Sequence, residues 1–145
     1  MYRHILIATD GSSLATRGVA HGVQLAKALN AKVTLLTVSE RFHTFSLEAE
    51  QLEETASSFK KHMAKEASKI LKEASRMAAD AGVEASLIHR EDDEPYQAIV
   101  RSAEGRGCDL IVMASHGRGG VSAMFLGSET VKVLSHSKLP VLVIH

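Results

Sequence analysis

The sequence predicts an α/β fold: a five-stranded parallel sheet with helices on both faces, in the order β-α-β-α-β-α-β-α-β. Segments with the composition of buried strands alternate with segments that repeat their apolar residues every three or four positions, as amphipathic helices do. Several strand segments are unbroken apolar runs, which is typical of a parallel sheet covered on both faces. Right-handed crossovers are expected between the strands.

The first strand is expected at His4–Thr9, followed by turn and helix-capping residues at Asp10–Ser13. A helix then runs to about Leu29 and is closed by Asn30. One face of this helix carries small and apolar residues, namely Ala15, Val19, Gly22, Ala26 and Leu29. The segment Lys32–Val38, rich in β-branched residues, is the second strand.

The segment from Ser39 to about Ser46 has no clear period, and a long helix follows that ends near Gly82. Its apolar face recurs at steps of three or four residues and consists of Phe59, Met63, Ala67, Ile70, Ala74, Met77 and Ala81. Lysine, arginine and glutamate occupy the other face. The pattern favours a helix packed on a sheet, with a solvated outer face, over a helix that lies on a membrane surface.

The remaining elements continue the alternation. Pro95 is typical of a first helical turn, and Gly105–Gly107 is a turn rather than a phosphate loop because it precedes a strand. The expected elements are a third strand at Val83–His89, a helix from Pro95 to about Glu104, a fourth strand at Asp109–Met113, a helix from Gly127 to about Ser135, and a fifth strand at Pro140–Ile144.

Length and composition indicate a single domain, residues 1–145, with a sizeable core. Seventeen basic residues balance 17 acidic ones, so no nucleic-acid partner is expected, because bulk binding to nucleic acid needs a basic surface. The single cysteine fits a reducing compartment, no signal peptide is visible, and no apolar run approaches the roughly 20 residues that span a bilayer. We expect a cytoplasmic protein that does not enter a membrane.

The most informative stretch is the glycine-rich segment Ala114–Gly120, followed by Gly127–Ser128. The first comes directly after a buried strand, and the second opens a helix. Glycines let backbone N–H groups approach phosphate oxygens, and a first helical turn adds unpaired donors and a partial positive charge. Strands one and four are expected to flank the point where strand order reverses, so Thr9–Asp10 and Ser115–Gly120 should face one crevice. This pattern favours a nucleotide phosphate as the ligand.

The common nucleotide motifs are absent. No Gly-Lys-Ser/Thr of a Walker A loop occurs, and Gly117–Gly120 breaks the dinucleotide-binding spacing. A different spacing is present: Ala114–Gly117 is followed by nine residues and then by Gly127–Ser128. It matches the pattern Gly-x-x-Gly, nine residues, Gly-Ser/Thr, except that Ala114 stands in place of the first glycine. With the start Ile5–Ser12, the strand end Leu35–Val38 and the terminus Pro140–Val143, the whole chain resembles the ATP-binding branch of the universal stress proteins.

The resemblance implies a Rossmann-like, adenine nucleotide alpha hydrolase-like fold and an ATP-binding regulatory protein, a nucleotide-dependent switch in the stress response. It also implies a homodimer through Pro140–Ile144, and an apolar strand at a sheet edge favours such pairing by itself. The site residues implied are Ala8, Thr9, Asp10 and Val38 for the base and ribose, Met113, Ala114 and Gly117 for the ribose and inner phosphates, and Gly127, Ser128 and Glu129 for the outer phosphates.

Several of these residues also have structural explanations. Asp10 either caps the first helix or holds a ribose hydroxyl or a nucleotide-bound Mg²⁺ or Mn²⁺. Ser128 either caps the fourth helix or binds phosphate, and Glu129 suits the helix dipole by itself. Arg118 either contacts phosphate or is solvated. If the position of Ala114 needs a positive φ, alanine costs about 1 kcal/mol or more there.

Two other functions stay open. A slow ATPase or self-phosphorylating protein would need a positioned base, and His116 in the loop has no obvious orienting carboxylate. A nucleotide-free dimeric interaction module is the second alternative, favoured by Ala114. The eight histidines lack the spacing of metal ligands, and Cys108 is expected in the core rather than as a nucleophile.

Overall fold

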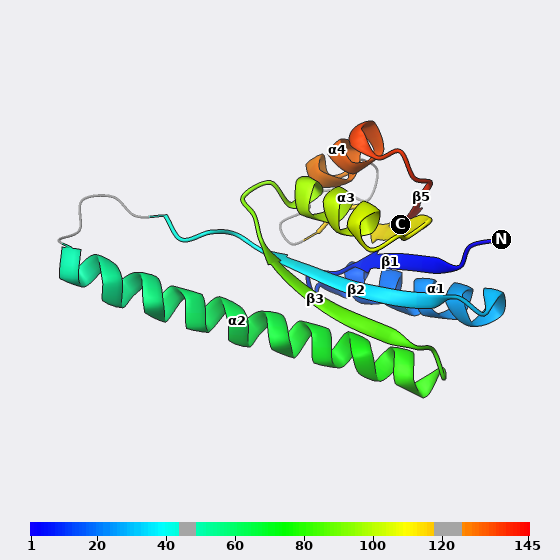
Figure 1. Ribbon diagram of the computed structural model, residues 1–145, viewed down its shortest axis with the longest axis horizontal. Coiled ribbons are helices and arrows are strands. Elements are labelled where there is room, and N and C mark those ends of the chain that lie inside the picture. Colours follow the sequence, from blue (N-terminus) through cyan, green and yellow to red (C-terminus); the bar gives the residue numbers. More distant parts are fainter. Residues whose placement is uncertain (44–48, 118–125) are drawn as a thin grey trace.

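The computed structural model describes residues 1–43, 49–117 and 126–145 of the chain. Strands and helices alternate along it as the sequence predicts (Figure 1). The elements are β1 (His4–Ala8), α1 (Ser13–Leu29), β2 (Lys32–Ser39), α2 (Ala49–Asp80), β3 (Ala85–Glu91), α3 (Pro95–Gly105), β4 (Leu110–Ala114), α4 (Ser128–His136) and β5 (Val141–Ile144).

The five strands form one parallel sheet with the order β3-β2-β1-β4-β5. Strand β1 lies in the centre, where Ile7 pairs with Leu35 of β2 on one side and with Val112 of β4 on the other. The chain first builds outward through β2 and β3, then returns to the opposite side of β1. This order confirms the predicted fold class and places the reversal of strand order between β1 and β4.

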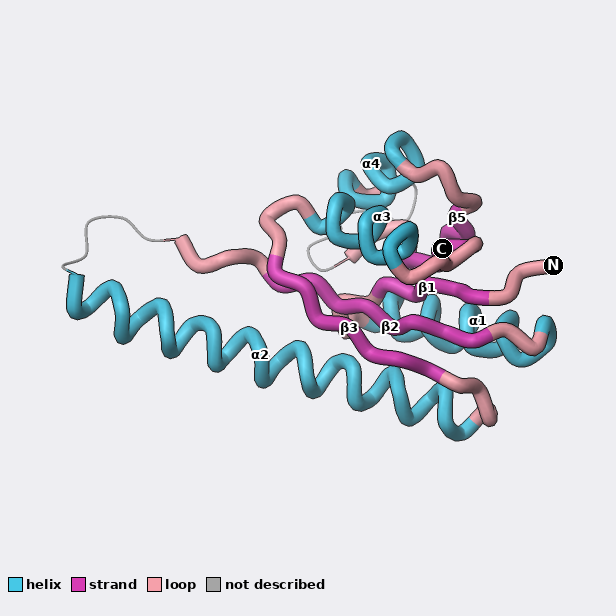
Figure 2. Tube along the Cα trace, in the orientation of Figure 1, coloured by secondary structure: helices cyan, strands magenta, loops and turns pink. Residues whose placement is uncertain are grey.

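Helices cover both faces of the sheet (Figure 2). Helices α1 and α2 lie on one face, above a core to which β1 contributes Ile5 and Ile7. Helices α3 and α4 lie on the other face, where Leu6 and Ile111 are buried. The alternation of side chains along each strand therefore divides the core into two layers that hold the sheet between them.

Two sequence expectations need correction, at strand β3 and at helix α2. Strand β3 begins at Ala85, two residues later than predicted, because Gly82 has a φ of +73° and the N–H of Val83 binds the carbonyl of Ala78 to close α2. The buried stripe of α2 is also rotated from the predicted face: Leu71 and Ala78 are buried, whereas Ile70 and Met77 are half-buried. None of the helices in the described ranges is both long and apolar enough to cross a membrane.

Candidate functional site

The loops that follow β1 and β4 meet at the carboxyl edge of the sheet. A Cβ atom added to Gly117 would lie 2.5 Å from Oδ2 of Asp10. These residues are distant in sequence, but β1 and β4 are neighbours in the sheet and both run toward this edge. The prediction that the two loops lie together at one edge of the sheet is confirmed for Asp10 and Gly117.

Asp10 organises the turn that leads from β1 into α1. Its Oδ1 atom accepts a hydrogen bond of 2.9 Å from the N–H of Ser12, and Gly11 takes a φ of +80° that favours glycine. The helix cap is Ser12, whose hydroxyl accepts from the N–H of Ala15 at 3.2 Å. The suggestion that Asp10 caps α1 is therefore wrong, and its second carboxylate oxygen lies toward the β4 loop.

Hydrogen bonds from α4 to the end of β4 close the base of the glycine-rich loop. The N–H of Gly127 donates to the carbonyl of Ser115 at 2.7 Å. The hydroxyl of Thr130 is buried and lies 3.0 Å from the carbonyl oxygens of both Ala114 and Ser115. A Cβ atom on Gly127 would lie 3.1 Å from the Cα of His116, so the backbones approach closely here. The start of α4 is thus fixed relative to the end of β4.

The N-terminus of α4 lies at this edge of the sheet, as predicted. Gly127 is the N-cap residue and makes no side-chain cap, so Ser128 is the first residue inside the helix and its capping role is wrong. The N–H groups of a first helical turn have no partners within the helix and carry a partial positive charge, which suits an anion. Ser128 is exposed to solvent at this position.

The carboxylate of Glu129 points to a different element. Its Oε2 atom accepts a hydrogen bond of 2.9 Å from the N–H of Tyr96 in the first turn of α3, and Lys132 lies 3.5 Å from Oε1. The backbone of Glu129 belongs to the start of α4, while its charge is bound by α3 and Lys132. The negative side chain of Glu129 is therefore directed toward α3 and Lys132, although its backbone lies in the first turn of α4.

The other predicted residues lie at the same edge of the sheet. Ala8 ends β1, and Thr9 follows it, with its N–H bound to the carbonyl of Leu36 at 2.9 Å. Val38 lies near the end of β2 and packs against the core on the α3 side. Met113 and Ala114 are buried at the end of β4, and Ala114 pairs with Ile144 in regular strand geometry. Arg118 lies outside the described residues.

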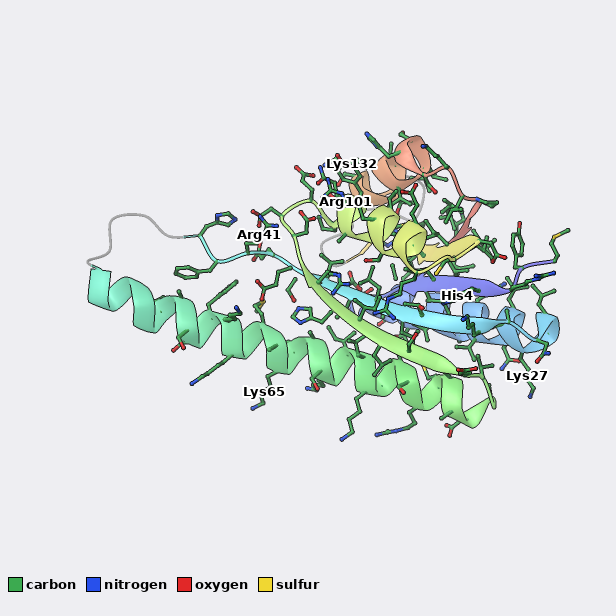
Figure 3. All side chains as sticks on the ribbon, in the orientation of Figure 1. His4, Lys27, Arg41, Lys65, Arg101 and Lys132 are labelled. Carbon is green, nitrogen blue, oxygen red and sulfur yellow. The ribbon has the colours of Figure 1, made fainter. Side chains whose placement is uncertain are left out.

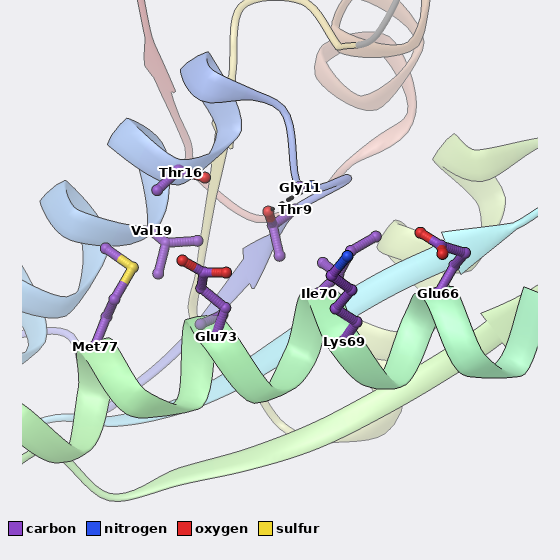
Figure 4. Close-up of a pocket in the computed structure, with 10 residues that line it drawn as sticks. Thr9, Gly11, Thr16, Val19, Glu66, Lys69, Ile70, Glu73 and Met77 are labelled. Carbon is purple, nitrogen blue, oxygen red and sulfur yellow. Dashed lines mark hydrogen bonds between the residues drawn. The ribbon is translucent and has the colours of Figure 1, made fainter.

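A cavity of about 230 Å³ lies between α1 and α2, next to the turn that follows β1 (Figure 4). Val19, Ile70 and Met77 form its apolar part, while side chains such as Glu66 and Lys69 of α2 form its polar part. Of the described residues predicted for the site, only Thr9 lines it. The cavity therefore borders the turn after β1, but none of the described residues of the loop after β4 lines it.

Other candidates for chemistry have structural explanations. Burial raises the pKa of Cys108 to about 11, so its thiol stays neutral and fills the core between the sheet and α3. His116 follows β4 at the start of the loop, and its Nδ1 lies 3.2 Å from the hydroxyl of Ser115. Within the part of the chain that the structure describes, no three His, Cys, Asp or Glu side chains are grouped so as to hold a metal ion.

Two residues that hold the site in place were not predicted from the sequence. Thr130 ties α4 to β4, and Tyr96 binds Glu129 through its backbone. Thr130 gives a weak signal, because a polar β-branched residue stands on the buried side of a short helix. Tyr96 gives none, since its backbone N–H makes the contact.

Comparisons with known proteins agree with this fold. The universal stress protein family model matches residues 1–145. Universal stress protein YxiE of Bacillus subtilis is 34% identical over 148 residues, with 99% of each chain covered. Universal stress protein MJ0531 of Methanocaldococcus jannaschii is 34% identical over 146 residues, covering 99% of this chain and 82% of its own.

Solved structures of similar proteins share this fold. The structure of the M. jannaschii protein MJ0577 superposes with a TM-score of 0.82 at 31% identity, covering 99% of this chain and 96% of its own. A universal stress protein in complex with cAMP superposes with a TM-score of 0.73 at 28% identity, covering 99% of this chain and 97% of its own.

Proposed function

The chain belongs to the universal stress protein family, and we propose that it binds ATP at the carboxyl ends of β1 and β4 and acts as a nucleotide-dependent regulatory switch. The observation that carries this proposal is the convergence of Asp10, Gly117 and Gly127 at the N-terminus of α4. A Cβ on Gly117 would meet the Asp10 carboxylate, and one on Gly127 would meet His116 and the carbonyl of Ser115. Glycines let a phosphate approach backbone N–H donors, and the first turn of α4 supplies such donors.

The residues fit an adenine nucleotide extended along this edge. The first turn of α4 would hold the outer phosphates, with the hydroxyl of Ser128 as a further donor. The Asp10 carboxylate, beside Gly117, would accept from ribose hydroxyls or approach a phosphate-bound Mg²⁺ or Mn²⁺. The end of β2 at Val38 would take the base. The cAMP complex of a relative that is 28% identical supports an adenine nucleotide as the class of ligand.

Calorimetric titration with ATP, beside mass spectrometry of any ligand extracted from the purified protein, tests this proposal. We expect saturable ATP binding that Gly127→Val abolishes, because a branched side chain would meet His116 and the carbonyl of Ser115. Ser128→Ala should weaken binding by about 1–2 kcal/mol, the contribution of one charge-assisted hydrogen bond. Unchanged affinity in a folded Gly127→Val variant would place the ligand elsewhere.

A homodimer through β5 is part of the same proposal. Strand β5 is an edge of the sheet, and its residues Val141, Leu142 and Val143 are only half-buried. Further exposed apolar side chains lie on and just before the neighbouring α4, namely Leu126, Val131 and Leu134. A two-fold axis along this edge would let each strand satisfy the other. The role in the stress response and the cytoplasmic location stay predictions.

A further inference from the structure

The first turn of α3 is capped by a residue of another helix. Glu94, its N-cap residue, makes no side-chain cap, and the N–H of Tyr96 binds the Glu129 carboxylate of α4 at 2.9 Å. Glu129 follows Ser128 directly and therefore lies in the first turn of α4, where the phosphates are proposed to bind. One side chain thus joins the proposed phosphate site to the start of α3.

Lys132 holds this carboxylate in place, and Figure 3 labels it beside α3 and α4. Its Nζ atom lies 3.5 Å from Glu129 and 3.3 Å from Glu94, and 5.6 Å from the centre of the Tyr96 ring. Glu94 and, after it, Glu129 raise the pKa of Lys132 above its ordinary value. The carboxylate of Glu129 is thus bound on both of its oxygens.

The turn before α3 also reaches the segment that follows β2. Asp93 accepts a hydrogen bond of 3.0 Å from the N–H of Arg41 and pairs with His43 at 2.9 Å. The N–H of Asp92 binds the carbonyl of Ser39 at 2.9 Å. Ser39 adjoins Val38, the residue expected at the base. The turn at residues 92–94 therefore contacts residues next to both ends of the proposed nucleotide site, namely Ser39 after Val38 and Lys132 beside Glu129.

We propose that Glu129 is a positioning residue that couples phosphate binding at α4 to the N-terminus of α3. This inference rests on the proposed function. A ligand that draws on the donors of Ser128 and Glu129 fixes the first turn of α4 and with it the carboxylate that caps α3. Coupling is reciprocal: if the ligand strengthens the bond between Glu129 and Tyr96, loss of that bond weakens ligand binding.

Amide hydrogen exchange of Tyr96, followed by NMR on the full chain, tests the coupling. We expect ATP and inorganic tripolyphosphate to slow the exchange of this amide, and adenosine to leave it unchanged. Glu129→Ala should speed the exchange without ligand and lower ATP affinity at least about fivefold, the lower end of measured couplings between sites. Glu129→Gln keeps an acceptor oxygen, so its Tyr96 exchange rate and its ATP affinity should both lie close to those of the wild type. Glu104→Gln, an exposed position on α3, is the matched control.

The outcomes separate this inference from the proposal on which it rests. ATP binding by the wild type with no change in Tyr96 exchange overturns the coupling alone, and that measurement needs no variant to fold. Unchanged ATP affinity in a folded Glu129→Ala variant also overturns it. Failure of the wild type to bind ATP overturns the proposed function and the coupling together.

Discussion

Oδ2 of Asp10 lies so close to the α-carbon of Gly117 that a methyl group added there would sit 2.5 Å from it. The glycine is not required for its backbone conformation, since the glycines with positive φ in the described ranges are Gly11, Gly82 and Gly107. A larger residue would need the Asp10 carboxylate to move, because two loops of the parallel sheet meet at this point. The close approach brings a carboxylate from the turn after β1 against the loop that opens the proposed phosphate site.

Gly117→Ala should lower ATP affinity about tenfold or more, equivalent to roughly 1.4 kcal/mol. The added methyl group would push the Asp10 carboxylate away and disturb the turn that it holds through Ser12. Gly105→Ala is the matched control, because nothing lies within 4 Å of its Cβ position. Calorimetry measures the ATP affinity of both variants. Equal affinities would show that the contact between Asp10 and Gly117 does not affect ATP binding.

Ala114→Gly should leave ATP affinity within about threefold of the wild type, less than 1 kcal/mol. Ala114 is an ordinary strand residue, 7% exposed and paired with Ile144, and Asn30 is the one non-glycine residue of the described ranges with a positive φ. The alanine is therefore not strained. Glycine should lower stability by roughly 0.5–1 kcal/mol through backbone entropy. A clear loss of affinity with the fold intact would show that the methyl group contacts the ligand.

Residue patterns predicted the elements and their order, because buried strands are short apolar runs and helices repeat their apolar residues every three or four positions. Each of these patterns lies within one segment of the chain. They also predicted that the loops at Asp10 and Gly117 meet, since parallel strands share one carboxyl edge. The cap that Glu129 gives to Tyr96 could not be predicted, because it joins two elements through a backbone N–H. The prediction that Asp10 and Ser128 cap helices α1 and α4 was wrong, because the N-cap residues are Ser12 and Gly127.

Two glycines of α1 should respond in opposite ways to alanine. A Cβ on Gly18 would make ordinary contacts, 3.7 Å from the nitrogen of Ala114, so Gly18→Ala should stabilise the protein by about 0.5–1 kcal/mol. A Cβ on Gly22 would lie 2.5 Å from Cδ1 of the fully buried Ile7. Overpacking of this kind costs roughly 1–3 kcal/mol, so Gly22→Ala should be the less stable variant. Urea unfolding compares the two, and equal stabilities would contradict tight packing between α1 and β1.

The stability of the protein should fall as the pH drops below about 6.5. His4 is buried and its Nε2 lies 2.7 Å from the hydroxyl of Thr34; burial, followed by the nearby Lys32, lowers its pKa below the ordinary value of 6.5. Below that value the unfolded chain binds a proton that the folded chain resists, so acid favours unfolding. The contribution is fully present above the unfolded pKa and declines toward the folded one.

His4→Gln removes the titrating group and should flatten the dependence of unfolding free energy on pH below about 6.5. The exposed His21 serves as a control, since His21→Gln should leave the slope unchanged. Urea unfolding at several pH values supplies the comparison. A wild-type slope that persists in His4→Gln would assign the acid sensitivity to other groups.

Val143→Pro should convert the proposed dimer to a monomer while the subunit stays folded. The carbonyls of Pro140 and Ile144 accept hydrogen bonds from Ile111 of β4 and from Ser115, which follows β4. In a parallel ladder the peptide groups of Val143 therefore face the open edge. Proline there removes a donor that only a second chain could use, and edge strands tolerate it. Leu142→Pro, whose N–H faces β4, is the matched control and should lower the melting temperature instead. Light scattering and thermal unfolding measure both effects, and a wild type that is monomeric at micromolar concentration, or a Val143→Pro variant that stays dimeric, would rule out this interface.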